Sequence, residues 1–340
     1  MSRPSPAKSQ SPSIADVAAL AGVSPQTVSR VSREAPNVRE GTRQKVRDAM
    51  ERLGYTPNRA AQALRSGSFH TLGVITQNVG KTGEACITAA IVSKAAARGY
   101  STTIIQVPHP ETDDLQEATT LLIDQAVDGI IIIQAGSAAR GSLRLPKGVP
   151  VSVSDSRLID DYPCVLHDQV SGVQEAMNYL FDLGHRSIAH IRGPLDSRSA
   201  RLRYAAWSRA LQDAGIPEGP LLYGDWSTKS GYIAGKELAK MDSVTAVLCG
   251  NDEMALGLMR ALDEGGRKIP DDISVIGFDG IDIGEYSIPP LTTIQQDFDR
   301  IGFELVDQVL SGLDGQSTEE DRRIVPSPLI VRASSGPRKK

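Results

Sequence analysis

Residues 13–31 read SIADVAALAGVSPQTVSRV, a pattern typical of two short helices joined by a tight turn. Ser13 can accept hydrogen bonds from the free amides of a starting helix, and Gly22 is typical of the residue that ends one. Ser24 and Pro25 then supply a second cap and a proline at the first helical position. The apolar residues of the first helix recur on one face: Ile14, Val17, Ala18 and Ala21. The stretch predicts a helix-turn-helix.

The second helix of this pair has an apolar and a polar side. Val28 and Val31 face inward. Gln26, Arg30 and Arg33 recur at i, i+4 and i+7 on the opposite side. Glutamine presents two groups that match adenine, and arginine presents two that match guanine. The second helix is therefore predicted to read bases in a major groove.

A third helix completes the small core through Val46, Ala49, Met50 and Leu53. We expect Arg43 and Arg47 on its outer face. Arg39 stands where a capping side chain is usual, and because arginine cannot accept from amides, about 1 kcal/mol of capping is missing. We expect Arg39 to contact a DNA phosphate instead. The three helices alone also fit a helical hairpin within a larger domain.

The segment after the third helix favours the DNA-binding interpretation. Asn58 can cap a short helix over residues 59–65, before Ser66-Gly67-Ser68 loosens the chain. Its small alanines allow two copies to lie side by side, and Leu64 has the right size to wedge between base steps in a minor groove. We therefore predict a disordered extension over 1–12, a headpiece over 13–56, and a hinge helix and linker over 57–68.

Charge is distributed unevenly along the chain. Residues 1–68 hold 11 Lys/Arg and 5 Asp/Glu, a net charge of +6, whereas the remainder carries −10. A basic end on an acidic protein is expected of a nucleic-acid-binding module, because phosphate contacts release condensed counterions. On charge alone, a merely solvated surface fits equally well.

Several classes of protein are disfavoured by what the sequence lacks. No stretch approaches the roughly 18 apolar residues of a membrane span, and no leader with a cleavage site begins the chain. We therefore expect a cytoplasmic protein without membrane association. The three cysteines form no C-x-x-C pair, so no metal site is predicted. No P-loop, H-E-x-x-H or G-x-S-x-G motif occurs, so we expect neither an enzyme nor a cofactor.

From residue 69 onward, apolar strands alternate with helices, which indicates parallel sheets covered on both faces. The expected strands are 72–76, 101–107, 129–134, 149–155, 187–193, 245–252 and 273–280, with helices near 83–98 and 112–125. Two doubly wound parallel sheets would form a two-lobed α/β core resembling periplasmic binding proteins. We place one lobe at about 69–166 and 297–323 and the other at about 167–294 and 325–336.

Within the helix expected near 83–98, Ile87, Ile91 and Ala95 recur at four-residue spacing. This stripe fits either a dimer interface or ordinary core packing.

Short polar residues follow the ends of several expected strands. Asp155, Asn251 and Asp279 occupy such positions, where open α/β sheets bind ligands. Carboxylate, amide and guanidinium groups suit the adjacent hydroxyls of a neutral sugar, while an aromatic ring can cover its C–H face. Taken singly, each of these residues fits a capping or turn role as well.

Seven segments together resemble the lac repressor (LacI/GalR) family from about residue 13 to 335. They are IADVAALAGVSPQTVSRV, TRQKVRDAMERLGYTPNRAAQAL, GPLDSRSARLRYAAW, GDWSTKSGY, GNDEMALG, ISVIGFDG and YSIPPLTTIQQDF. In that family the helix that starts at SPQT reads the major groove and the hinge leucine intercalates. From residue pattern and resemblance together, the predicted DNA-binding residues are Ser24, Gln26, Thr27, Ser29, Arg30, Arg33, Arg39, Asn58, Arg59 and Leu64.

The resemblance also implies an effector site. The effector-binding residues expected from it are Gln77, Asp155, His167, Ser199, Arg203, Trp226, Asn251, Asp279, Gln296 and Phe298. Gln77 and His167 depart from the serine and phenylalanine of the family's namesake, so the galactose end of the cleft is kept and the far end is altered. We expect a galactoside or a related neutral sugar. His167 fits both a ligand contact and a structural role.

The predicted function is a dimeric repressor that a small sugar releases from a palindromic operator. The chain lacks the leucine-repeat tail through which the namesake forms tetramers, and Pro25 replaces a tyrosine that helps to choose the operator. A co-repressor that depends on a sugar or a purine remains an alternative, although GDWS and SARLR do not favour purine stacking. An exported sugar-binding transport protein would need a signal peptide and would have no use for a headpiece.

Overall fold

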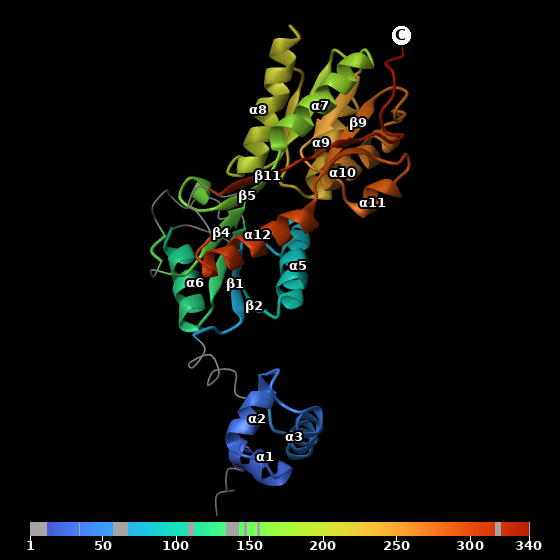
Figure 1. The fold of residues 1–340 in the computed structure, drawn as a ribbon. Helices are drawn as coiled ribbons and strands as arrows, with labels where there is room; N and C mark the ends of the chain where they lie inside the picture. Colours follow the sequence, from blue (N-terminus) through green and yellow to red (C-terminus); the bar gives the residue numbers. More distant parts are fainter. Residues whose placement is uncertain are drawn as a thin grey trace, which may run out of the picture. The chain divides into compact units, whose positions relative to one another are not determined.

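The computed structural model describes residues 12–33, 35–56, 67–107, 112–133, 143–145, 148–154, 157–316 and 321–339. The chain divides into two compact units, Met1–Phe69 and His70–Lys340 (Figure 1). Each unit has hydrophobic clusters of its own. In the described residues, no helix is long and apolar enough to span a membrane.

The first unit contains the predicted helices α1 (Ile14–Ala21), α2 (Pro25–Ser32) and α3 (Glu40–Leu53). Ser13 and Asp16 form a capping box at the start of α1, and Gly22 ends that helix at φ 65°, in the left-handed region. The inward stripes of the three helices meet in one cluster around Val17, Val28 and Val46, which are fully buried. The helix-turn-helix and its apolar faces are therefore confirmed.

The expectation that Arg43 lies on the outside of α3 was wrong. Its side chain is only 12% exposed, and its guanidinium donates to the carbonyl oxygen of Ala35 at 2.9 Å. It also lies 3.4 Å from the Glu40 carboxylate. The loop after α2 offers a carbonyl acceptor near α3, and hydrogen bonding draws the arginine toward it. Arg47 is exposed, as predicted.

The predicted absence of a side-chain cap on α3 is confirmed. Arg39 is the N-cap residue, at φ −60° and ψ 140°, and its side chain makes no capping hydrogen bond. Because these angles suit a capping serine, we expect Arg39→Ser to stabilise the first unit by about 1 kcal/mol. Calorimetric melting of the full chain would show this as a rise in the transition of that unit. Arg52→Ser, on the exposed last turn of α3, is the control and should give no gain.

The same variant tests the predicted phosphate contact of Arg39. Loss of one phosphate contact in each subunit should reduce the slope of log affinity for DNA against log salt by nearly 2 for a dimer. If Arg39→Ser is more stable but leaves the slope of log DNA affinity against log salt unchanged, Arg39 does not contact a phosphate.

The second unit contains two six-stranded sheets. The first sheet has the order β11-β5-β4-β3-β1-β2 and all its paired strands are parallel. Its strands are β1 (Thr71–Thr76), β2 (Ser101–Gln106), β3 (Gly129–Ile133), β4 (Val151–Ser154), β5 (Cys164–His167) and β11 (Arg322–Val325). The helices around it are α5 (Thr82–Ala97), α6 (Thr112–Asp124), α12 (Phe298–Leu313) and the 3₁₀ turn η1 (Arg157–Asp160). Their two apolar clusters, one with α6 and one with α5 and α12, cover both faces.

The second sheet has the order β12-β10-β9-β8-β6-β7. Its strands are β6 (Ile188–Arg192), β7 (Leu221–Tyr223), β8 (Ala246–Cys249), β9 (Ser274–Asp279), β10 (Thr292–Gln295) and β12 (Leu329–Ile330). Only the edge strand β12 is antiparallel among these pairings. Its helices are α7 (Gln169–Asp182), α8 (Arg198–Asp213), α9 (Thr228–Leu238), α10 (Asp252–Glu264) and the short α11 (Asp282–Glu285). The predicted architecture of two doubly wound sheets is confirmed, and the chain passes between them after β5, β10 and β11.

The stripe of Ile87, Ile91 and Ala95 on α5 belongs to the core. These side chains are 6%, 0% and 0% exposed, and they belong to the apolar cluster that also contains residues of α12. Helices α5 and α12 lie side by side (Figure 1). Gly302 of α12 permits this approach, because a Cβ there would lie 2.9 Å from the amide nitrogen of Ile91. Of the two interpretations of this stripe, the structure supports core packing.

Candidate functional site

A pocket of about 630 Å³, partly open to solvent, lies where strands of both sheets end. Eight of the ten predicted effector-binding residues line it: His167, Ser199, Arg203, Trp226, Asn251, Asp279, Gln296 and Phe298. Asp155 lies outside the described residues. Gln77 does not line the pocket, and its backbone N–H donates to Glu84 Oε2 at 2.9 Å.

The buried guanidinium of Arg203, on α8, lines the pocket and contacts Gln169 and Asp279. Its Nε donates to Gln169 Oε1 at 2.7 Å, and its Nη1 donates to the carbonyl oxygen of Gly250. Nη1 is also 3.6 Å from Asp279 Oδ1, and the guanidinium carbon lies 3.5 Å from the ring centroid of Phe278. These contacts fix the planar fork, which can then hold neighbouring oxygens of a ligand in a defined geometry.

Asp279 ends β9 beside this guanidinium and is held in an unusual backbone conformation. Its φ is 125°, and that of Trp226 across the pocket is 75°, values that side-chain-bearing residues rarely adopt. Such strain concentrates at ligand sites. The side-chain amide of Gln296 donates to Asp279 Oδ1. Burial raises the pKa of the Asp279 carboxyl to about 7, although Arg203 opposes the shift.

The titration of Asp279 predicts pH-dependent ligand binding. A ligand hydroxyl that donates to the ionised carboxylate stabilises it, so binding lowers the Asp279 pKa and releases a proton. Affinity should therefore rise as pH increases through about 7, and should be about tenfold lower at pH 6 than at pH 8. Calorimetric titration with sugars at pH 6, 7 and 8 measures this, and Asp279→Asn should remove the slope. A wild-type affinity independent of pH would contradict the prediction.

The sequence left two interpretations of Asn251, a helix cap and a residue of the ligand pocket, and the structure places it in both positions. It is the N-cap of α10, and its Oδ1 accepts from the Met254 N–H at 3.0 Å. Its Nδ2 donates to the Trp226 carbonyl oxygen at 3.1 Å, which leaves one N–H for another acceptor. The Trp226 indole lies against Gly193, where a Cβ would be 2.3 Å from the ring. The absence of a side chain at Gly193 therefore leaves room for the Trp226 indole.

Six polar pocket residues were missed by the sequence reasoning: Lys81, Thr82, Glu84, Ser154, Gln169 and Glu253. Ser154 ends β4 and Gln169 starts α7, so their positions at element ends offered a signal. Glu253 follows the Asn251-Asp252 pair, and its carboxylate accepts from the Thr82 hydroxyl, a contact that joins the two lobes. None of the seven segments that resemble the family includes Lys81 or Glu84, so the resemblance gave no indication there.

The polar face of α2 is partly committed to local hydrogen bonds. Ser24 Oγ accepts from the Thr27 N–H at 3.2 Å, so Ser24 acts as a cap. Arg33 folds back and donates to Ser29 Oγ at 3.0 Å. Gln26, Arg30 and Arg39 are exposed. Asn58, Arg59 and Leu64 lie outside the described residues, and DNA contact by any of the ten predicted residues stays a prediction.

A helix-turn-helix unit followed by a two-lobed unit with a pocket at its strand ends defines the class of ligand-responsive DNA-binding regulators. Residues 13–58 match the lacI family of bacterial regulatory proteins, and residues 177–335 match the periplasmic binding protein-like domain. The chain is 37% identical to the lactose operon repressor of Escherichia coli K12 over 326 residues, 94% of this chain and 89% of the repressor. It is 32% identical to the ribose operon repressor of the same organism, over 94% and 98% of the two chains. The chain therefore belongs to the LacI family of bacterial regulatory proteins.

Solved structures agree with this assignment. The lac repressor dimer bound to operator and the anti-inducer ONPF matches with a TM-score of 0.86 and 35% identity, over 96% of this chain and 100% of that one. The complex of the transcriptional regulator CelR with cellobiose matches with a TM-score of 0.70 and 29% identity, over 95% and 99%. The predicted family and fold class are confirmed.

Proposed function

We propose that this protein is a transcriptional repressor that binds a palindromic operator as a homodimer and is released by a small neutral sugar of the galactoside type. The observation that carries the proposal is the buried Arg203 guanidinium, which lies in the pocket with Asp279 and Asn251 at the ends of strands. The same chain also contains a helix-turn-helix. The relatives named above are repressors, so we propose regulation rather than catalysis, in the cytoplasm where operator DNA is found.

The chemistry of the pocket favours a neutral, hydroxyl-rich ligand. When Asp279 is ionised, it and Arg203 carry opposite charges 3.6 Å apart, so their fields partly cancel and a charged ligand gains less. The guanidinium donates, the carboxylate accepts, and the free N–H of Asn251 donates, which suits adjacent hydroxyls. Trp226 and Phe298 supply aromatic walls for the C–H faces of a sugar ring. A purine would leave part of this polar set unpaired, which disfavours purine-dependent co-repression.

Coupling between the pocket and the DNA would operate through the two lobes of the second unit. Pocket residues come from both lobes, and the Thr82 hydroxyl joins them through Glu253. A ligand that contacts both lobes favours the arrangement in which those contacts fit best. If operator binding requires another arrangement, sugar and DNA oppose each other without touching.

Selection of DNA by the full chain tests the proposal. We expect a randomised duplex library to yield two half-sites related by a dyad, because a two-fold dimer presents two α2 helices. Adding methyl β-galactoside, lactose or cellobiose to parallel selections should release the DNA with at least one sugar. Tighter binding with sugar would indicate co-repression, and the absence of any selected sequence would refute the repressor assignment.

A further inference from the structure

The end of the pocket formed by the first lobe contains a buried carboxylate with one fully used and one unused oxygen. Glu84 is 1% exposed and lines the pocket. Its Oε2 accepts from the Thr76 hydroxyl at 2.6 Å, the Gln77 N–H at 2.9 Å and the Asn78 N–H at 2.7 Å. Its Oε1 is buried and has no hydrogen-bond partner among the described residues. The three donors fix the carboxylate and leave its other oxygen unpaired.

The pKa of the Glu84 carboxyl lies above its ordinary value. Burial raises its pKa, but the Thr76 hydroxyl, two backbone amides and the charge of Lys81 lower it. An ionised Oε1 can only accept hydrogen bonds, so it requires a donor such as a hydroxyl.

His167 supplies two further unused polar atoms in this pocket. Both ring nitrogens are buried and lack a partner within the described part of the chain. Burial, reinforced by Arg203, lowers the His167 pKa to about 3, so the ring is neutral at physiological pH and offers one donor and one acceptor. Its ring packs edge-on against Phe298, with centroids 5.5 Å apart. The unused atoms of His167 therefore adjoin the Phe298 wall of the sugar site proposed above.

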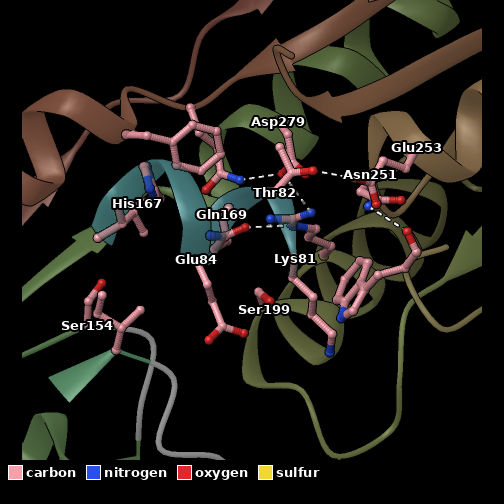
Figure 2. Close-up of a pocket in the computed structure, with 17 residues that line it drawn as sticks. Lys81, Thr82, Glu84, Ser154, His167, Gln169, Ser199, Asn251, Glu253 and Asp279 are labelled. Atoms are coloured by element: carbon pink, nitrogen blue, oxygen red, sulfur yellow. Dashed lines mark hydrogen bonds and ion pairs between the residues drawn. The ribbon is translucent and has the colours of Figure 1, made fainter. Parts of the chain in front are cut away.

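We propose that Glu84 and His167 form a second subsite, which binds a hydroxyl-bearing unit joined to the sugar held at Arg203, so that the effector is a disaccharide rather than a simple alkyl or aryl glycoside. Figure 2 shows His167 and Ser154 at one end of the pocket and Asn251 and Glu253 at the other, so both units have polar neighbours. This inference rests on the proposed sugar-binding function.

The unused polar atoms discriminate between classes of effector. Glu84 Oε1 and the two His167 nitrogens are buried and have no hydrogen-bond partner among the described residues. An alkyl or aryl group leaves each of these atoms unpaired, which is unfavourable in a buried site. A sugar unit supplies the hydrogen bonds, because each hydroxyl both donates and accepts. We therefore expect a disaccharide to bind more tightly than an alkyl or aryl glycoside, which leaves these polar atoms without hydrogen bonds.

Calorimetric titration of the full chain at pH 8 tests the subsite. The probes are methyl β-galactoside, phenyl β-galactoside and lactose, with methyl β-glucoside, phenyl β-glucoside and cellobiose as a second series. In the series that binds, we expect the disaccharide to bind at least about tenfold more tightly than the methyl or phenyl glycoside.

Glu84→Gln isolates the contribution of Oε1. The glutamine amide oxygen can keep the three donors, while its NH₂ places a donor where the ligand hydroxyl needs an acceptor. We expect the disaccharide to lose about 10- to 100-fold in affinity and the methyl glycoside less than about threefold. Glu237→Gln, an exposed position on α9 with the same change of charge, should alter neither affinity. Melting curves report whether the variants fold.

His167→Phe provides an independent test that keeps the ring packing against Phe298. It should weaken disaccharide binding and strengthen that of the phenyl glycoside. A wild-type protein that binds the methyl or phenyl glycoside as tightly as the disaccharide would overturn the second subsite and leave sugar binding intact. Equal loss for all probes in Glu84→Gln would also overturn it. If no sugar binds, the proposed function itself fails, and the subsite with it.

Discussion

Replacing Arg203 with alanine is expected to weaken effector binding by about 100-fold or more and to abolish the release of DNA by sugar. The guanidinium is 4% exposed and serves Gln169, Gly250 and Asp279 at once. Truncating one partner of a buried, hydrogen-bonded charge pair costs about 2–5 kcal/mol. The loss of Arg203 also removes the cation that opposes the upward pKa shift of Asp279, so more of that carboxyl is protonated at pH 7 and one of its oxygens then donates instead of accepting.

Two further variants separate lost recognition from general damage. Arg203→Lys keeps the charge but lacks the planar fork, so we expect partial loss of sugar affinity. Arg209→Ala removes an exposed arginine from the same helix, where it pairs with Asp213 at the surface, and should change little. An Arg203→Ala protein that folds and binds sugar within about threefold of the wild type would contradict the site assignment.

Replacing Arg30 with alanine is expected to give the largest loss of operator affinity. Arg30 is exposed on the outer face of α2, opposite the buried Val28 and Val31. A bidentate contact of arginine with a base is worth about 1–3 kcal/mol of discrimination. A dimer loses the contact in both half-sites, so specific binding should fall about 30-fold to 10⁴-fold. Anisotropy titration with the selected duplex measures the loss.

Arg52→Ala is the matched control, because it removes the same charge from the exposed end of α3. Both variants should weaken binding to unrelated DNA to a similar, small extent, since that affinity depends on charge. If Arg52→Ala weakened operator binding as much as Arg30→Ala, α2 would not be the reading helix.

Much of the first unit could be predicted because its signals are local. Caps at Ser13 and Ser24, the stop at Gly22 and apolar stripes at helical spacing all act within a few residues. The position of Arg43 could not be predicted in this way. Its partner is the carbonyl of Ala35, in a loop that only tertiary packing brings near α3.

The second unit shows the same distinction. Buried strands such as β3 and β9 are continuous apolar runs and could be recognised, whereas β7 and β12, with 3 and 2 residues, carry too little pattern. Family resemblance indicated the Arg203 end of the pocket. It could not indicate Glu84, because this residue lies outside the seven segments that resemble the family. In addition, Glu84 has one unpaired oxygen because three donors that only the folded chain brings together all bind the other.

Reciprocal linkage between sugar and DNA tests the central claim most directly. The dissociation constant of operator DNA is measured with and without saturating sugar, and that of the sugar with and without saturating operator. A single molecule with two arrangements must give the same ratio in both directions, and couplings of this kind are typically about 5- to 150-fold. We predict equal ratios, with each ligand weakening the other. If the sugar binds with the same affinity whether or not the operator is bound, the pocket does not regulate DNA binding and the account is wrong.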